Sequence, residues 1–160
     1  QVATIQLDFN QPANFELTCM NEKGEKEQVV MVHCAIMGSI ERFMSTLIEH
    51  TAGNFPLWLS PVQVKILPIS EKFAEYAEKV YREISNAGIR VEMDDSNESL
   101  GKRIRIAKTE KTPYILVLGE KEVEAGTVTV EMRGAEKGET NTLENFLKYA
   151  LLEIEKKAIW

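Results

Sequence analysis

Val62-Gln63-Val64-Lys65-Ile66-Leu67 opens the stretch of sequence that decides the fold of this chain, because its apolar residues predict a strand. From Ser70, apolar residues recur at helical spacing until Gly88, which ends the predicted helix. Residues 89–93 predict the next strand. A strand, a helix and a strand within about thirty residues form a right-handed crossover between parallel strands. The chain is therefore predicted to be an α/β protein.

The residues after this crossover extend the same sheet. They predict a helix over residues 100–109 and strands over residues 114–118 and 127–132. A tight turn at Gly119 joins these two strands, which places an antiparallel strand at the edge of the sheet. Asn141 and Glu144 have the spacing of a capping box before a final helix. Residues 61–160 are therefore expected to form a mixed β-sheet flanked by three helices.

The residues before the crossover have a different pattern of apolar and polar side chains. Residues 4–9 alternate, which predicts a half-buried strand with Thr4, Gln6 and Asp8 on its polar face. Further strands are predicted over residues 15–20 and 29–32, and a helix over residues 40–52. We expect an antiparallel meander with this helix packed on it.

A linker is predicted between these two regions. Residues 53–60 have no periodicity, and Pro56 and Pro61 exclude a regular helix there. We therefore expect one domain over residues 1–52 and a second over residues 61–160.

Composition excludes several classes of protein. No apolar run reaches the roughly 18 residues of a membrane-spanning helix. The net charge of −6 excludes a general electrostatic hold on phosphates, so a nucleic-acid partner requires a local basic patch. Cys19 and Cys34 are too few for a disulfide scaffold, which favours a cytoplasmic setting. Because Gln1 stands where an initiator Met is usual, we expect a piece of a longer protein.

The junction of residues 33–43 concentrates polar groups between a strand end and a helix start. Arg42 has the donor fork that can clamp a nucleotide phosphate, or it can form a surface pair with Glu41. His33 can serve as one zinc ligand, but a hydrogen-bonded histidine is the more common case. Cys34 points to the opposite face of the strand, so it does not share an ion with His33.

A basic run supplies the local patch. Residues 102–111 hold five basic residues against one acid. Helical spacing places Lys102, Arg105 and Lys108 on one face, which suits phosphates but is equally typical of a solvated surface. Asn97 can read a base edge, or it can simply form a turn.

Four runs together resemble the C-terminal part of the threonyl-tRNA synthetase family. They are TIQLDFN at residues 4–10, HCAIMGSIERF at 33–43, FPLWLSPVQV at 55–64 and SNAGIRV at 85–91. The runs occur in the family's order and spacing across nearly the whole chain. The resemblance implies that residues 1–52 end a class II catalytic domain with its motif 3, and that residues 61–160 form its anticodon-binding domain.

The resemblance also implies site residues in the first domain. Arg42 takes the role of the motif 3 arginine, which binds the ATP phosphates as the threonine carboxylate attacks. His33 matches the family's third zinc ligand. The positions that line the ATP and threonine pocket are Gln1, Thr4, Gln6 and Ser39. Cys34 departs from the family, which commonly has an arginine there.

In the second domain, the resemblance implies an anticodon site. Asn97, Arg105 and Glu122 match anticodon contacts of the family. From its place on the basic face of the predicted helix, we also expect Lys102 to contact phosphate. A further arginine of the family falls at Glu131, where we expect nearby Arg133 to substitute.

The implied parent is a homodimeric ligase that activates threonine with ATP and Mg, carries zinc, and charges tRNA(Thr). Motifs 1 and 2 and two zinc ligands are not among these residues, so the chain alone is expected to be inactive. One alternative is a non-catalytic anticodon-type module that binds tRNA or another RNA, with a start codon close to Gln1. Regulatory binding of mRNA is another.

Overall fold

A mixed sheet of five strands, in the order β6-β5-β7-β8-β9, is the centre of the second of two units into which the chain divides, residues 53–160. The strands are β5 (Val64–Pro68), β6 (Val91–Met93), β7 (Tyr114–Leu118), β8 (Thr127–Met132) and β9 (Glu139–Thr142). In this computed structural model, which describes residues 3–159, β5 pairs in parallel with β6 and β7, and β8 pairs antiparallel with β7 and β9. The predicted crossover and mixed sheet are confirmed.

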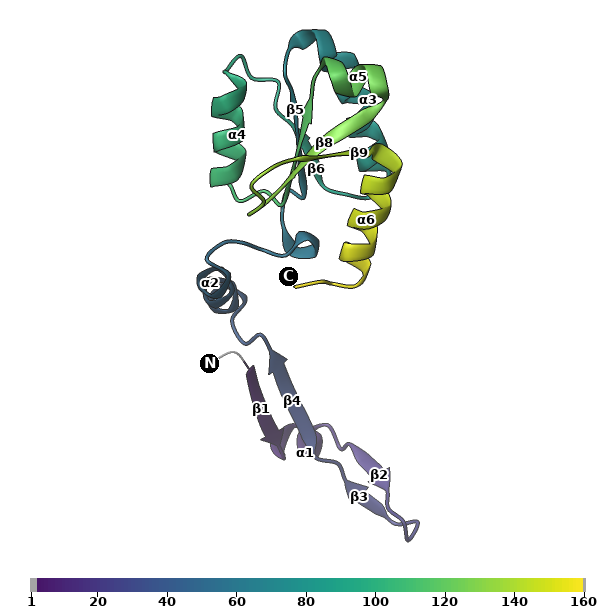
Figure 1. Cartoon of the computed structure of the whole chain (residues 1–160). Helices are drawn as coiled ribbons and strands as arrows, with labels where there is room; N and C mark the ends of the chain where they lie inside the picture. Colours follow the sequence, from purple (N-terminus) through teal and green to yellow (C-terminus); the bar gives the residue numbers. More distant parts are fainter. Residues whose placement is uncertain (1–2, 160) are drawn as a thin grey trace. The chain divides into compact units, whose positions relative to one another are not determined.

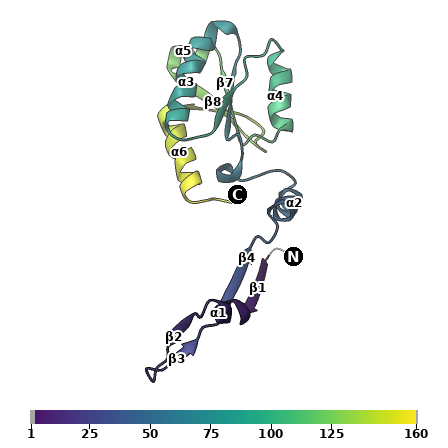
Figure 2. The same ribbon diagram turned by 180° about the vertical axis from the view of Figure 1, so that it is seen from behind.

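Helices cover both faces of this sheet. They are η1 (Leu57–Leu59), η2 (Glu71–Phe73), α3 (Ala74–Asn86), α4 (Leu100–Thr109), α5 (Glu120–Ala125) and α6 (Leu143–Glu155). Figures 1 and 2 show α4 on one face of the sheet, with α3 and α6 on the opposite face. The larger core lies on the face that α3 and α6 cover, and α4 on the opposite face carries the basic run.

Three details of this unit differ from the sequence prediction. The tight turn expected at Gly119 is instead followed by the short helix α5, because the Glu122 carboxylate accepts a hydrogen bond from the Gly119 N–H. The edge strand β9 was not expected. The final helix is capped by Thr142, not Asn141, since the Thr142 hydroxyl accepts from the Asn145 N–H.

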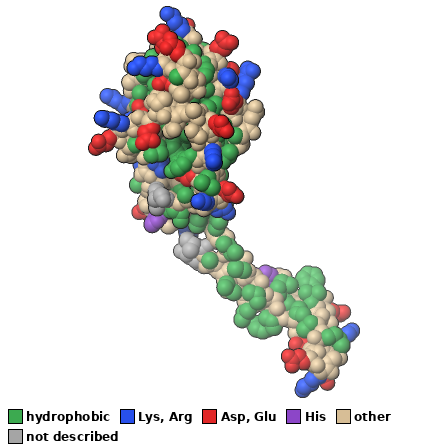
Figure 3. Space-filling model, turned by 45° about the vertical axis from the view of Figure 1, so that its right-hand side comes forward, with side chains coloured by type: hydrophobic (Ala, Val, Ile, Leu, Met, Phe, Trp, Pro, Cys, Tyr) green, Lys and Arg blue, Asp and Glu red, His purple; other side chains and the backbone are tan. Residues whose placement is uncertain are grey.

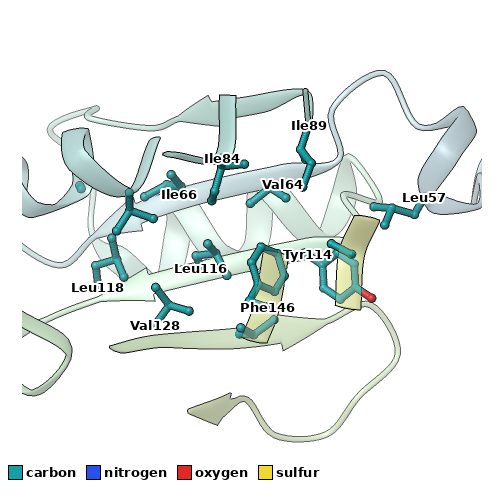
Figure 4. Packing of buried hydrophobic residues seen from close by; sticks show 14 residues of the cluster. Leu57, Val64, Ile66, Ile84, Ile89, Tyr114, Leu116, Leu118, Val128 and Phe146 are labelled. Atoms are coloured by element: carbon teal, nitrogen blue, oxygen red, sulfur yellow. The ribbon is translucent and has the colours of Figure 1, made fainter. Parts of the chain in front are cut away.

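The core follows from strand alternation. Tyr114, Leu116 and Leu118 of β7 point toward α3 and α6 and pack with the buried side chains shown in Figure 4. Ile115 points the other way and packs with Leu67 of β5 and Ala107 of α4. One strand therefore contributes to two apolar layers, as expected for a sheet covered on both faces.

Residues of the expected linker pack within this second unit. Leu57 is buried in the larger core, and its carbonyl accepts a hydrogen bond from the Gln63 side chain. The Arg90 guanidinium donates to the carbonyls of Trp58 and Ser60. Prolines bound this segment as the sequence indicated, but Leu57–Leu59 still form one turn of 3-10 helix.

The first unit, residues 1–52, has a different topology from the predicted meander. Its elements are β1 (Ala3–Asp8), α1 (Asn10–Asn14), β2 (Thr18–Met20), β3 (Lys26–Gln28), β4 (Met31–Ile36) and α2 (Ile40–Thr51). β1 pairs with β4, and β2 pairs with β3, in two separate sheets. The meander fails because the Asp8 carboxylate accepts from the N–H groups of Asn10 and Gln11, and residues 10–14 form a short helix in place of a turn between paired strands.

This first unit buries very little. Among its described residues, only Pro12 and Thr51 are buried. Ile5 remains 72% exposed, and Leu7 and Ile36 are exposed as well, so the half-buried strand with a helix packed on it is not what forms. Figure 3 shows hydrophobic side chains, in green, gathered on the surface of this unit. An apolar strand face is buried only when another element packs on it, and no element among the described residues packs on the face that holds Ile5 and Leu7.

The two units are expected to differ in stability. Because β1 to β4 bury little apolar surface, little favourable free energy offsets the conformational entropy that these strands lose on folding. Hydrogen exchange on the chain should therefore show fast exchange at amides of β1 and β4 and slow exchange at β5 and β7. A shortened chain of residues 53–160 should unfold at the same temperature as the whole. Slow, cooperative exchange at β1 would contradict this expectation.

Candidate functional site

In the first unit, the candidate residues share one face of the β1 and β4 pair. The register pairs Gln6 with His33 and Thr4 with Ala35. Directly paired residues of antiparallel strands point to the same side, so Thr4, Gln6 and His33 lie on one face. Cys34 pairs with Ile5 on the opposite face, as predicted. Gln1 lies outside the described residues.

His33 has a hydrogen-bond partner. Its Nε2 lies 3.0 Å from Oδ2 of Asp8, which is the arrangement that the residues alone favoured. The Gln11 N–H, followed by the His33 side chain, lowers the pKa of the Asp8 carboxyl below its usual range. Beside His33, a depression of about 620 Å³ is lined by Gln6, Asp8 and Asn10, among others.

The described residues do not make a complete zinc site. Within residues 3–159, no three His, Cys, Asp or Glu side chains gather closely enough to hold a metal ion. A zinc site needs three or four protein ligands in tetrahedral geometry. His33 therefore fits zinc only as one ligand of a set that other residues would complete.

Ser39 and Arg42 stand at the start of α2. Met37 and Gly38 have φ values of 67° and 46° there, which turns the chain sharply from β4 into the helix. The Ser39 hydroxyl donates to the Glu41 carboxylate at 2.8 Å, so the Ser39 side chain does not cap the first-turn N–H groups of the helix. Its own backbone N–H, followed by the Ser39 hydroxyl, lowers the pKa of Glu41.

Arg42 is exposed and available to an anion. Glu41 is engaged by Ser39, and among the described residues no ion pair involves the Arg42 guanidinium. The alternative of a surface pair with Glu41 is therefore not what the structure shows. A guanidinium next to uncapped helix N–H groups is chemically suited to a phosphate.

In the second unit, α4 presents the basic run. Lys102, Arg105 and Lys108 are exposed, as the spacing predicts, while Ala107 is buried. Lys102 Nζ lies 2.6 Å from Oε1 of Glu98. Lys108 Nζ lies 2.9 Å from Oε2 of Glu131 on β8. Because Lys102 and Lys108 each pair with a carboxylate, the basic ridge that Lys102, Arg105 and Lys108 form on α4 is partly neutralised.

Polar side chains continue from this ridge across β8. Glu131 and Thr129 lie on the same face of β8, and the Thr129 hydroxyl donates to the Glu122 carboxylate at 2.7 Å. We call Arg105, Lys108, Glu131, Thr129 and Glu122 the polar strip. Burial alone would raise the pKa of Glu122, but the Thr129 hydroxyl and the Gly119 N–H outweigh it and lower the pKa below its usual range. The strip thus holds one carboxylate, Glu131, paired with a cation and a second, Glu122, held by hydrogen bonds.

The other predicted anticodon residues lie in different settings. Asn97 is exposed in the loop between β6 and α4. The Arg133 guanidinium donates to the carbonyls of Lys111 and Phe55, both at 2.8 Å. Burial lowers the pKa of Arg133, against the charge of Glu153. Arg133 therefore joins two backbone segments of this unit.

Sequence reasoning missed two features. The first is the Lys108 and Glu131 pair, which joins α4 to a strand and has no signal in local spacing. The second is Arg103, which belongs to the basic run but is buried. A signal for it exists, because Leu100, Arg103, Ile104 and Ala107 follow the spacing i, i+3, i+4, i+7 of a core stripe.

This arrangement suits RNA better than bare phosphate. Carboxylates accept from the amino and imino groups of exposed bases, whereas Arg and Lys contact phosphates and base acceptors. A strip that combines both is suited to reading unpaired bases.

Comparisons with known families cover both units. A profile described as "Anticodon binding domain" matches residues 63–153, more than half of the chain. A profile described as "tRNA synthetase class II core domain (G, H, P, S and T)" matches residues 1–51.

Similar proteins extend these matches. Threonine–tRNA ligase of Carboxydothermus hydrogenoformans is 46% identical over 157 residues, which are 98% of this chain and 25% of that protein. The ligase of Caldanaerobacter subterraneus subsp. tengcongensis is 50% identical over 159 residues, 99% of this chain and 25% of its own length. A solved structure of the RNA binding domain of threonyl-tRNA synthetase from Cryptosporidium parvum Iowa II has a TM-score of 0.86 at 38% identity, and covers 96% of this chain and 39% of that one.

The fold and the two family matches define a chain of a class II aminoacyl-tRNA synthetase. Within this class, the chain belongs to the threonyl-tRNA synthetase family and matches its C-terminal part. It spans about a quarter of the length of these curated relatives. Because the class II core profile also matches the first unit, the synthetase reading is favoured over an independent RNA-binding module.

Proposed function

We propose that this chain is the part of a threonine–tRNA ligase that reads the tRNA anticodon and completes the catalytic site. The full protein would activate threonine with ATP and Mg and transfer it to tRNA(Thr). The observation that carries the tRNA assignment is the polar strip, where Glu131 pairs with Lys108 and Glu122 accepts from Thr129 on a partly exposed face. The names of the relatives support the choice of threonine.

In this proposal, the first unit ends the catalytic domain and the second unit binds the anticodon, with residues 53–60 between them. Arg42 binds the ATP phosphates and stabilises the charge that develops as the threonine carboxylate attacks the α-phosphorus. Thr4, Gln6 and Ser39, with Gln1, line the pocket for the adenylate and threonine. Support comes from the shared polar face of β1 and β4 and from the guanidinium at the start of α2, which forms no ion pair within residues 3–159.

His33 is proposed as one zinc ligand of the full protein. Zinc, when bound, would contact the amino and hydroxyl groups of threonine and so exclude valine. The polar face that His33 shares with Thr4 and Gln6 supports this placement. The remaining ligands would come from outside the described residues.

The anticodon contacts are proposed to be Asn97, Arg105 and Glu122 with bases, and Lys102 with phosphate. Arg133 is proposed to contact RNA through the guanidinium N–H groups that do not bind the carbonyls of Lys111 and Phe55. Glu122 is held in place because both of its carboxylate oxygens accept hydrogen bonds within the unit.

The proposed setting of the full protein is a homodimer in the cytoplasm. Both cysteines, Cys19 and Cys34, are free thiols, which suits a reducing compartment. Across the described part of the chain, every helix is too short or too polar to cross a bilayer.

Asn97→Ala tests the base-reading role. We expect this change to weaken binding of cognate tRNA(Thr) by about 1 to 3 kcal/mol, because one base-edge contact is lost. Binding of a tRNA with a substituted anticodon should barely change. Lys102→Ala should weaken binding of both tRNAs equally, since a phosphate contact carries no sequence information. Filter binding or fluorescence titration at fixed salt measures both.

Asn86→Ala is the matched control, because Asn86 is an exposed asparagine at the end of α3 and has no proposed RNA contact. It should leave both affinities unchanged. Equal losses on cognate and substituted tRNAs for Asn97→Ala would refute base reading at this position.

A further inference from the structure

Arg103 is the buried member of the basic run on α4. Only 5% of it is exposed, and its guanidinium is directed at the backbone of two neighbouring strands. One terminal nitrogen donates to the carbonyl of Pro68 at 2.7 Å, and the other donates to the carbonyl of Asp94 at 2.8 Å. Pro68 is the last residue of β5, and Asp94 directly follows β6. One side chain therefore ties together the carboxyl ends of two parallel strands.

Asp94 passes this restraint on to the loop that carries Asn97. Its N–H donates to the carbonyl of Ile66, and its carboxylate accepts from the Ser96 N–H at 2.9 Å. Ser96 directly precedes Asn97 in the chain. The contacts therefore run from Arg103 through Asp94 and Ser96 to the backbone of Asn97.

The shape of the guanidinium explains why an arginine occupies this position. Arg103 Nε is buried and has no hydrogen-bond partner among the described residues, which is unfavourable for a side chain that only fills space. An apolar side chain would fill the same volume without that cost. A lysine has a single nitrogen on a flexible stem and cannot reproduce a planar fork that joins two carbonyls. The two carbonyl contacts are thus the distinctive contribution of this residue.

We propose that Arg103 is a positioning residue for anticodon recognition: it holds the ends of β5 and β6 so that the loop presents Asn97 in a fixed orientation. This inference rests on the proposed function of Asn97 in base reading. Although Arg103 lies in the basic run, the proposal gives this residue no contact with RNA. Its effect should appear in discrimination between anticodons and should disappear when Asn97 is removed.

A double-mutant cycle tests this proposal on the 160-residue chain. The quantity measured is the ratio of the dissociation constants for anticodon-substituted and cognate tRNA(Thr). We expect Asn97→Ala to lower this ratio about tenfold and Arg103→Met to lower it about three- to tenfold. In the Asn97→Ala background, Arg103→Met should cause no further loss, because the two residues act as one unit. Arg103→Lys, which keeps the charge, should fail to restore full discrimination.

Arg90→Met is the matched control. Arg90 also donates to backbone carbonyls, those of Trp58 and Ser60, but the segment that it holds has no proposed RNA contact. Its replacement should lower the thermal midpoint without changing the ratio. All titrations are made well below the lowest midpoint of the set, and Arg103→Lys decides the question if Arg103→Met does not fold.

The outcomes separate the two hypotheses. If Asn97→Ala leaves the ratio unchanged, base reading by Asn97 is wrong, and the positioning role of Arg103 fails with it. If Asn97→Ala lowers the ratio but Arg103→Met and Arg103→Lys keep the full ratio, the positioning role alone is overturned. Losses that simply add in the double variant would also overturn it, since they would indicate an independent contact.

Discussion

Replacing Arg42 by alanine in the full-length protein that contains this chain is expected to slow threonine-dependent ATP–pyrophosphate exchange by about 10²- to 10³-fold. This is the usual loss when one preorganised donor to a developing negative charge is removed. The guanidinium is free for this role, since no ion pair involves it among the described residues and Glu41 is engaged by Ser39. The loss should appear mainly in the maximal rate.

The same geometry separates this effect from a loss of folding. Arg42 is exposed on α2, and alanine is the most favourable residue in a helix interior, so the helix itself should not be weakened. Arg42→Lys keeps the charge but loses the fork of donors, so it should give an intermediate loss. Arg82→Ala, which removes an exposed arginine that pairs with Glu78 on α3, is the control and should keep the wild-type rate. A wild-type rate in Arg42→Ala would refute the assignment.

The 160-residue chain alone should show no exchange at all. Class II motifs 1 and 2 are not among these residues, so Arg42 has no site to complete within this chain. Robust exchange by the purified chain would falsify the view that these residues complete a site built mostly from other parts of the protein.

Much of the second unit could be predicted from the sequence because its elements carry their own periodicity. The stripe of α3 includes Ala77, Val80 and Ile84, all of which are buried, and the strand pattern of β7 matches its two-sided packing. By contrast, α5 has only Val123 as a large apolar residue, so it has no stripe to detect. Its helix depends on the Glu122 hydrogen bonds to Gly119 and Thr129, which are partly tertiary.

The edge strand β9 was missed for a related reason. Its sequence Glu-Thr-Asn-Thr has no apolar residue, and it forms a strand because its backbone pairs with β8. In the first unit, the alternation of residues 4–9 did predict a strand, but alternation indicates which side chains share a face and does not show whether that face is covered. Ile5 and Leu7 share a face as predicted, yet this face remains exposed.

The same limit applies to the site residues, because local spacing places a residue on a helix face but does not reveal its contacts with distant elements. Local spacing was enough to place Lys102, Arg105 and Lys108 on one exposed face of α4. It was not enough to show that Lys108 pairs with Glu131, because this contact joins elements that are distant in sequence. A pair of this kind depends on the order of strands in the sheet, which spacing along one helix does not contain.

Phe146→Ala is expected to destabilise the second unit by about 3 to 5 kcal/mol, the usual cost of removing a buried aromatic side chain. Phe146 is 4% exposed, and its ring meets that of Tyr114 edge-on, with centroids 5.4 Å apart and planes at 85°. Figure 4 shows it beside Tyr114, within the layer that α6 closes. Both the apolar area and the edge-to-face contact would be lost. Urea denaturation followed by circular dichroism measures the change.

This loss should leave anticodon discrimination intact, because Phe146 lies on the face of the sheet opposite to α4 and the polar strip. Domains of this size are commonly stable by only about 5 to 15 kcal/mol, so the variant should unfold at a much lower urea concentration. In the cold it should remain folded and should bind cognate tRNA with the wild-type preference. Leu151→Ala, at an exposed position of the same helix, should shift the midpoint far less. Equal shifts for the two variants would show that α6 does not close the core through Phe146, and a changed preference in folded Phe146→Ala would show that the two faces of the sheet are coupled.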